Sequence, residues 1–131
     1  RTQIEVSRTD SFVLGIDVPV RDSGKLDGTP SVTIVGPAGQ FSTDGLIIAA
    51  RHIHVNPEDA KRLGLTEGDF VDVRVGDDHR GLIFEHTLVR VAKDSFTEMH
   101  IDTDEANAAG IGVHAAGELL PEQATVIRRL S

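Results

Sequence analysis

Short apolar and β-branched runs, separated by turns rich in glycine, recur along the whole chain. The continuous apolar run over residues 45–55 predicts a single buried strand, and alternation over 71–75 predicts a half-buried one within residues 70–75. Further strands are expected at residues 4–6, 31–35, 80–84, 87–91, 97–101 and 124–130. Many short strands with few helices favour a mainly β fold, in the form of short-stranded β-barrels capped by short α-helices.

Short helices are predicted between these strands. The clearest follows Asn56, a capping residue that precedes a proline at the first helical position and two acids in the first turn. This helix should run to residues 62–63 and stop at Gly64. Two further helix starts are at residues 7–10, before the apolar residues 12–14, and at residues 102–105, before Ala109.

The composition restricts the chemistry. The 131 residues include 13 basic and 21 acidic side chains, and the net charge of −8 argues against a nucleic-acid surface. Because the chain has no cysteine, any transition-metal site must use His, Asp or Glu, and a thiolate nucleophile is excluded. No apolar run has the length of a membrane span, so we expect a cytoplasmic protein with no membrane segment.

Three histidines are candidate metal ligands. His52 and His54 lie two residues apart on a predicted strand, so both project from one face, and His100 can supply a third imidazole if its strand is a neighbour. Three imidazoles with an open fourth position are typical of a catalytic zinc site. The alternative is a hydrogen-bonded polar patch, since the His-x-His motif is short. A solvated role is favoured for the remaining histidines, His79, His86 and His114.

The acidic residues give weaker signals. Glu5 shares a strand face with Gln3 and Ser7, and by itself it is a surface acid. A helix-capping role is favoured over a catalytic one for Asp102, Asp104 and Glu105. No Gly-x-Ser-x-Gly elbow, Walker loop, dinucleotide glycine motif or His-Glu-x-x-His helix is present, which disfavours hydrolase-triad and nucleotide-phosphoryl chemistry.

Residues 3–10, 50–60 and 98–110, with a further match at 80–84, closely resemble the phosphate propanoyltransferase family, the propanediol-utilisation type of phosphotransacylase. The resemblance runs from Arg1 to about Gly110. It implies an acyltransferase that converts acyl-CoA and orthophosphate into acyl phosphate and free coenzyme A, at a site with two metals, usually zinc, between two small β-barrels. Direct attack by phosphate, without an acyl-enzyme, fits the lack of cysteine.

The resemblance also assigns ligands. It implies that His52, His54 and His100 hold one metal and that Glu5 helps to hold the other. The remaining ligands of the second metal come, in the family, from an earlier His-x-His segment that this sequence lacks, as it lacks a phosphate-binding arginine upstream of Glu5. We therefore expect residues 1–49 to be a remnant of one barrel, residues 50–131 to be most of the second, and a complementary N-terminal segment or chain to be a partner.

Three residues are candidates for binding coenzyme A, and none is assigned as catalytic. The ring of Phe12 offers a stacking face for adenine, while Arg8 and Ser23 can bond phosphate oxygens. The alternative for Phe12 is a helix residue in the core.

Two other functions stay open at this point. One is a non-catalytic metal-binding barrel, and the other is a metallo-hydrolase that uses the same histidines to activate water. The sequence also leaves open a homo-oligomer, the acyl-chain preference between propanoyl and acetyl, and the native metal. Family members often work inside bacterial microcompartments, so that location is compatible with the resemblance.

Overall fold

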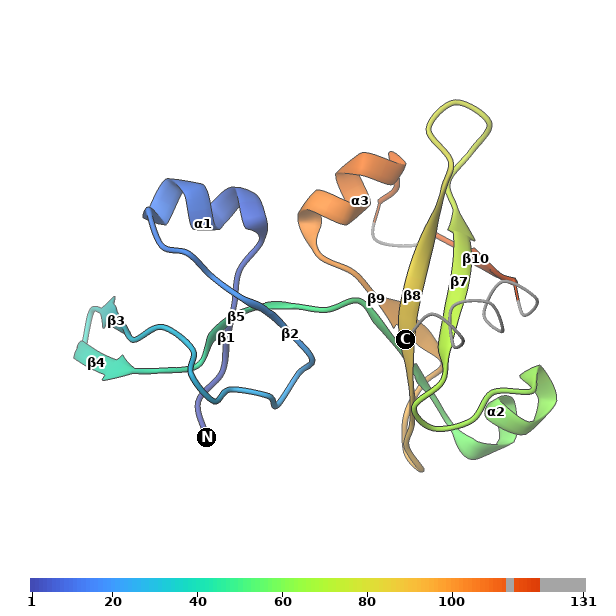
Figure 1. Cartoon of the computed structure of the whole chain (residues 1–131), viewed down its shortest axis with the longest axis horizontal. Coiled ribbons are helices and arrows are strands. Elements are labelled where there is room, and N and C mark those ends of the chain that lie inside the picture. Colours follow the sequence, from blue (N-terminus) through green and yellow to red (C-terminus); the bar gives the residue numbers. More distant parts are fainter. Residues whose placement is uncertain (113–114, 121–131) are drawn as a thin grey trace. The chain divides into compact units, whose positions relative to one another are not determined.

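The computed structural model describes residues 1–112 and 115–120 (Figure 1). The chain divides into two compact units, Arg1–Ala50 and Arg51–Ser131. In both units strands outnumber helices, which confirms the prediction of a mainly β fold with short helices. The assignment of the units to two barrels stays a prediction. The expected strand at 124–130 and the expected solvated role of His114 lie outside the described residues.

The first unit is organised around a central strand. That strand, β5, pairs in parallel with β1 on one side and β2 on the other, while β3 and β4 form an antiparallel hairpin. The buried side chains of Val18, Leu46 and Ile48 form its core. The elements are β1 (Ile4–Glu5), α1 (Arg8–Leu14), β2 (Val20–Arg21), β3 (Val32–Gly36), β4 (Gly39–Thr43) and β5 (Leu46–Ala49).

Helix α1 begins where its sequence predicts. The Ser7 hydroxyl accepts a hydrogen bond from the Asp10 backbone N–H at 3.1 Å, and the Asp10 carboxylate accepts one from the Ser7 N–H at 3.2 Å. This reciprocal capping box satisfies two N–H groups that have no partner inside the helix. Because α1 follows β1 after two residues, the box also fixes how the chain leaves the strand that carries Glu5.

The second unit contains one five-stranded sheet in the order β10-β7-β8-β6-β9. Strands β6 and β8 are parallel, and the other neighbouring pairs are antiparallel. The elements are β6 (His52–Val55), α2 (Pro57–Leu63), β7 (Phe70–Val75), β8 (Leu82–Val91), β9 (Glu98–His100), α3 (Thr103–Ala109) and β10 (Gly117–Leu120).

One face of this sheet forms the hydrophobic core. Ile53 and Val55 of β6 pack with valines of β7 and β8 and with Ala60 of α2, while Ala109 of α3 belongs to a second buried cluster with Val75 and Phe84. Successive side chains of a strand point to opposite faces. The burial of Ile53 and Val55 therefore directs the two side chains that alternate with them, His52 and His54, to the other face.

The strand predictions need two corrections. Residues 45–55 form two strands rather than one, because β5 and β6 belong to sheets of different units. Residues 80–84 and 87–91, predicted as separate strands, contribute to the single strand β8. The pairing of β8 with β7 shifts in register between Val71 and Val73, and His86 has a positive φ of 56°. This irregularity bends one strand at the point where the sequence suggested a break.

The helix predictions at residues 57–63 and 102–109 are confirmed. Asn56 caps α2, since its side-chain oxygen accepts from the Asp59 N–H at 2.8 Å, and the helix ends at Gly64 in the left-handed region. Asp102 caps α3 in a capping box with Glu105. Strands β2, β4 and β10 were not predicted. Strand β2 is too short to show an apolar pattern, and β4 and the first half of β10 are too exposed.

Candidate metal centre

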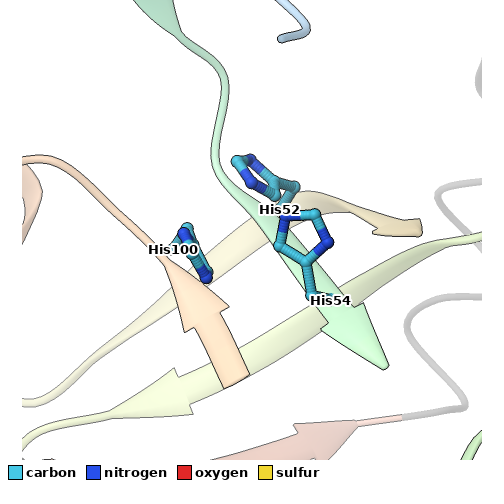
Figure 2. Close-up of side chains that lie close together, drawn as sticks. All are labelled: His52, His54 and His100. Carbon is cyan, nitrogen blue, oxygen red and sulfur yellow. The ribbon is translucent and has the colours of Figure 1, made fainter. Parts of the chain in front are cut away.

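Strands β6 and β9 bring the three candidate histidines together. Their antiparallel register places His52 opposite His100 and His54 opposite Glu98. The ring centroids are 4.9 Å apart for His52 and His54, 5.0 Å for His52 and His100, and 4.8 Å for His54 and His100. Figure 2 shows the three rings gathered beside these two strands. The sequence alone predicted that His52 and His54 share a face of β6. The pairing of β6 with β9 adds His100 as the third imidazole.

The donor set suits a zinc ion. One ring nitrogen from each histidine lies within 4.8 Å of the others. Zinc–nitrogen bonds of about 2.0–2.1 Å place the nitrogens of a tetrahedral site about 3.4 Å apart, so the rings would have to move closer together to bind one ion. His52 and His54 are half-buried and His100 is exposed, which leaves one side open to a small ligand. Among residues 1–112 and 115–120 no other group of three His, Asp or Glu side chains meets this criterion.

The electrostatics of the cluster favour neutral imidazoles. Burial lowers the pKa of His54 below its usual value, and the neighbouring His52 and His100 lower that pKa further. A neutral imidazole keeps a lone pair for a metal, whereas a protonated one has none. The crowding of the three rings therefore prepares His54 to act as a ligand near neutral pH.

The metal-free chain should lose stability as the pH falls through the histidine range. In the unfolded chain His54 titrates at about pH 6.5, while in the folded chain its pKa is lower. The unfolded state then binds the proton more readily than the folded state. The contribution of neutral His54 to the stability of the fold is therefore complete above about pH 6.5, and it is lost as the pH falls from there to the lower pKa of the folded chain. NMR titration of the ring C–H resonances checks this: His54 should have a midpoint below 6.5, and an equal or higher midpoint would contradict it.

A polar network joins the ends of the two ligand strands. Arg51, which directly precedes His52, donates to the Glu105 carboxylate at 3.1 Å and twice to the Glu85 backbone carbonyl at 2.9 and 2.6 Å. The other oxygen of Glu105 accepts from the N–H of Asp102, two residues after His100, at 3.0 Å. Glu105 thus links the start of β6 to the residues that follow β9. This gives Glu105 a structural role, as the capping prediction required.

The first unit carries the other predicted site residues. Glu5 is exposed on β1, and its carboxylate accepts from Gln3 Nε2 at 2.7 Å. The same Nε2 donates to the Ser23 hydroxyl at 3.0 Å, and Gln3 Oε1 accepts from the Gly24 N–H at 2.8 Å. Gln3 therefore brings Glu5 and Ser23 to one polar site. The sequence pattern placed Gln3 and Glu5 on one face of a strand. It did not show that Ser23, which lies 18 residues after Glu5, is close to them.

Arg8 and Phe12 take different positions on α1. Arg8 is half-buried and donates through Nη1 to the Val18 carbonyl at 3.0 Å. Phe12 is 75% exposed, so the alternative of a core helix residue is wrong, and its ring is available for stacking. The predicted contacts of both residues with coenzyme A stay predictions.

In the described part of the chain, two histidines lie outside the cluster. His79 is exposed in the turn before β8, where its backbone N–H donates to Asp77. His86 is also exposed, and its ring stacks on Phe70 with centroids 3.8 Å apart. One acidic residue near the cluster was missed by the sequence analysis: Glu98 lies two residues before His100 and 3.1 Å from its Nε2. The two-residue spacing was the available signal.

The three histidines lie within the part of the chain that matches a known protein family. The sequence profile described as phosphate propanoyltransferase matches residues 1–112, which include His52, His54, His100 and Glu5. The chain belongs to the phosphate propanoyltransferase family. This confirms the resemblance seen in the sequence.

Individual members of the phosphate propanoyltransferase family are similar over most of this chain. The phosphate propanoyltransferase of Limosilactobacillus reuteri is 50% identical over 113 residues, or 86% of this chain and 53% of the relative. That of Thermotoga maritima is 53% identical over 109 residues, covering 82% and 52%, and that of Escherichia fergusonii is 54% identical over 110 residues, covering 83% and 52%. The chain spans about half the length of these relatives.

In residues 1–112 and 115–120 no helix is long and apolar enough to cross a membrane.

Proposed function

We propose that this chain is part of an acyltransferase that exchanges coenzyme A and orthophosphate on a short acyl group, with zinc held by His52, His54 and His100. The observation that carries the proposal is the three-imidazole cluster on β6 and β9 in a member of the phosphate propanoyltransferase family. The relatives are named for this transfer, and each of them is about twice as long as the matched region.

The imidazoles of His52, His54 and His100 would hold the metal. Zinc bound there supplies Lewis acidity toward a carbonyl or phosphate oxygen. His54 contributes a neutral ring because its pKa is lowered. The hydrogen bonds of Glu105 with Arg51 and Asp102 hold the start of β6 near the end of β9. No side chain is needed as a nucleophile, because phosphate can attack the acyl carbon directly and the thiolate of coenzyme A leaves.

Glu5 is proposed as a ligand of a second metal. A single carboxylate cannot complete a metal site, and we propose that a complementary N-terminal segment supplies the other ligands. Gln3 fixes one oxygen of Glu5 at 2.7 Å, which orients the carboxylate as outer hydrogen bonds do for metal ligands. A complementary segment of this kind is consistent with the greater length of the relatives.

Phe12, Arg8 and Ser23 are proposed to contact coenzyme A. The exposed ring of Phe12 can stack on adenine, and Ser23 offers a hydroxyl to a phosphate oxygen. A guanidinium has five N–H donors, and the bond from Arg8 to Val18 is made through Nη1, so further donors can reach a phosphate. A homo-oligomer and a location inside a microcompartment stay predictions.

A thiol-release assay tests the function. Propanoyl-CoA is incubated with zinc-loaded protein, with and without orthophosphate, and the free coenzyme A is measured with a thiol reagent. Because this chain has no cysteine, it adds no thiol background of its own. The chain is assayed alone and after co-expression with the N-terminal half of the L. reuteri relative. Phosphate-dependent release, with acyl phosphate as product, is the expected result.

Other outcomes identify the competing functions. Release that is unaffected by phosphate would indicate a metallo-hydrolase. Zinc binding without release, even in the presence of the N-terminal half, would indicate a non-catalytic metal-binding barrel. Acetyl-CoA in parallel reactions determines the acyl preference.

A further inference from the structure

Glu98 lies on the same face of β9 as His100. The two residues are separated by Met99, which packs against the core, so alternation directs Glu98 and His100 away from the core together. The pairing of β9 with β6 places Glu98 directly opposite His54. A carboxylate therefore stands beside two of the three imidazoles.

The contact between Glu98 and His100 has a defined direction. Glu98 Oε1 lies 3.1 Å from His100 Nε2. An ionised carboxylate only accepts hydrogen bonds, so His100 Nε2 must carry the proton. In a neutral imidazole the other nitrogen then has the lone pair. The hydrogen bond to Glu98 thus selects the tautomer in which Nδ1 of His100 can bind a metal.

We propose that Glu98 is a positioning residue of the metal centre, which orients the His100 ring and presents Nδ1 to the metal without itself becoming a ligand. The inference rests on the proposed zinc site. Metal-bound histidines commonly donate their second ring N–H to a carboxylate, which fixes the ring and makes it a better ligand. The sequence profile and the names of the relatives assign no role to Glu98.

A purely structural role for this contact makes a different prediction. The side chains of Glu98 and His100 are 61% and 45% exposed. A pair this exposed contributes little to folding, because water screens the charges and two mobile side chains must be ordered. Loss of Glu98 should then change neither stability nor metal binding. The positioning role instead predicts unchanged stability and weaker metal binding.

Zinc affinity of the whole chain separates the two roles. The metal is removed with a chelator, and zinc is titrated in competition with a chromophoric chelator. Glu98→Ala should weaken zinc binding about 10- to 100-fold, the range typical for loss of an outer-shell partner. Glu98→Gln should lose less, because the amide oxygen still accepts the His100 proton. The matched control is Glu118→Gln, an exposed glutamate on β10 at the opposite edge of the same sheet, which should bind zinc like the unmodified chain.

The outcomes distinguish this inference from the function it rests on. If the unmodified chain binds no zinc, the metal centre and the proposed function both fail. If it binds zinc and Glu98→Ala binds equally well, the role of Glu98 is refuted while the metal centre stands. Should Glu98→Ala fail to fold, Glu98→Val carries the same test, because valine suits a strand and also removes the acceptor for the His100 proton.

Cobalt substitution separates positioning from direct coordination. The visible absorption bands of bound cobalt(II) depend on the ligands and on the coordination geometry. At saturating cobalt, Glu98→Ala and the unmodified chain should give the same bands, since the three imidazoles are retained in both. Bands that show one protein ligand fewer in the variant, with water in its place, would identify Glu98 as a ligand and would overturn the positioning role.

Discussion

The variant His52→Ala should abolish zinc binding at the site proposed in the second unit. His52 is the residue of β6 that faces His100 across the strand pair, and its ring lies about as close to His54 as to His100. Without it, two imidazoles remain, which are too few to hold zinc against a chelator. The loss of zinc affinity should be larger than the loss of about 10- to 100-fold that is expected when only an outer hydrogen bond is removed. Elemental analysis after dialysis measures the bound zinc directly.

His79→Ala is the matched control for this experiment. His79 is an exposed histidine of the same unit, in the turn before β8 and outside the cluster, so zinc content should not change. His100→Ala should behave like His52→Ala, because it removes the ligand on the opposite strand. An unchanged zinc content in both His52→Ala and His100→Ala would refute the assignment of the ligands.

Local sequence signals predicted much of the fold. The helix starts at Ser7, Asn56 and Asp102 were found because each cap bonds a backbone N–H three residues away. The error over residues 45–55 has a physical reason. An apolar run shows that residues are buried but does not show which core buries them, and here the chain passes from one unit to the other between Ala50 and Arg51.

The candidate site was predictable only in part, for a similar reason. The spacing of His52 and His54 shows that they share a face, whereas the contact with His100 depends on the pairing of β6 with β9. That pairing was suggested by the family resemblance and not by any local pattern. Arg51 and Glu98, which lie beside the histidine cluster, act through hydrogen bonds whose geometry appears only after the strands of the second unit are placed.

The metal centre also has a consequence for the strand that carries His100. Strand β9 has three residues, lies at the edge of the sheet and pairs with β6. Short edge strands hold few backbone hydrogen bonds and open easily. Zinc bound by His52, His54 and His100 would crosslink β9 to β6, so zinc binding and ordering of this edge are expected to be coupled.

The variant Gly45→Ala should strongly destabilise the first unit. Gly45 precedes β5 with φ of +105°, and a Cβ atom there would clash with the backbone oxygen of Thr2. The Gly45 carbonyl also accepts from the Ile4 N–H at 2.9 Å, which attaches the strand β1 to β5. Because the clash is with backbone, relief requires movement of β1. We expect a loss of about 2–4 kcal/mol in the free energy of unfolding.

Gly36→Ala provides the comparison within the same unit. A Cβ atom at Gly36 meets no atom within 4 Å, and the backbone there does not require glycine. Its effect should lie between no change and about 1 kcal/mol of stabilisation, since alanine restricts the unfolded chain. Urea unfolding followed by circular dichroism measures both variants. Equal stabilities would show that the first unit tolerates a side chain at position 45, and would contradict the close approach of the Thr2 backbone to Gly45.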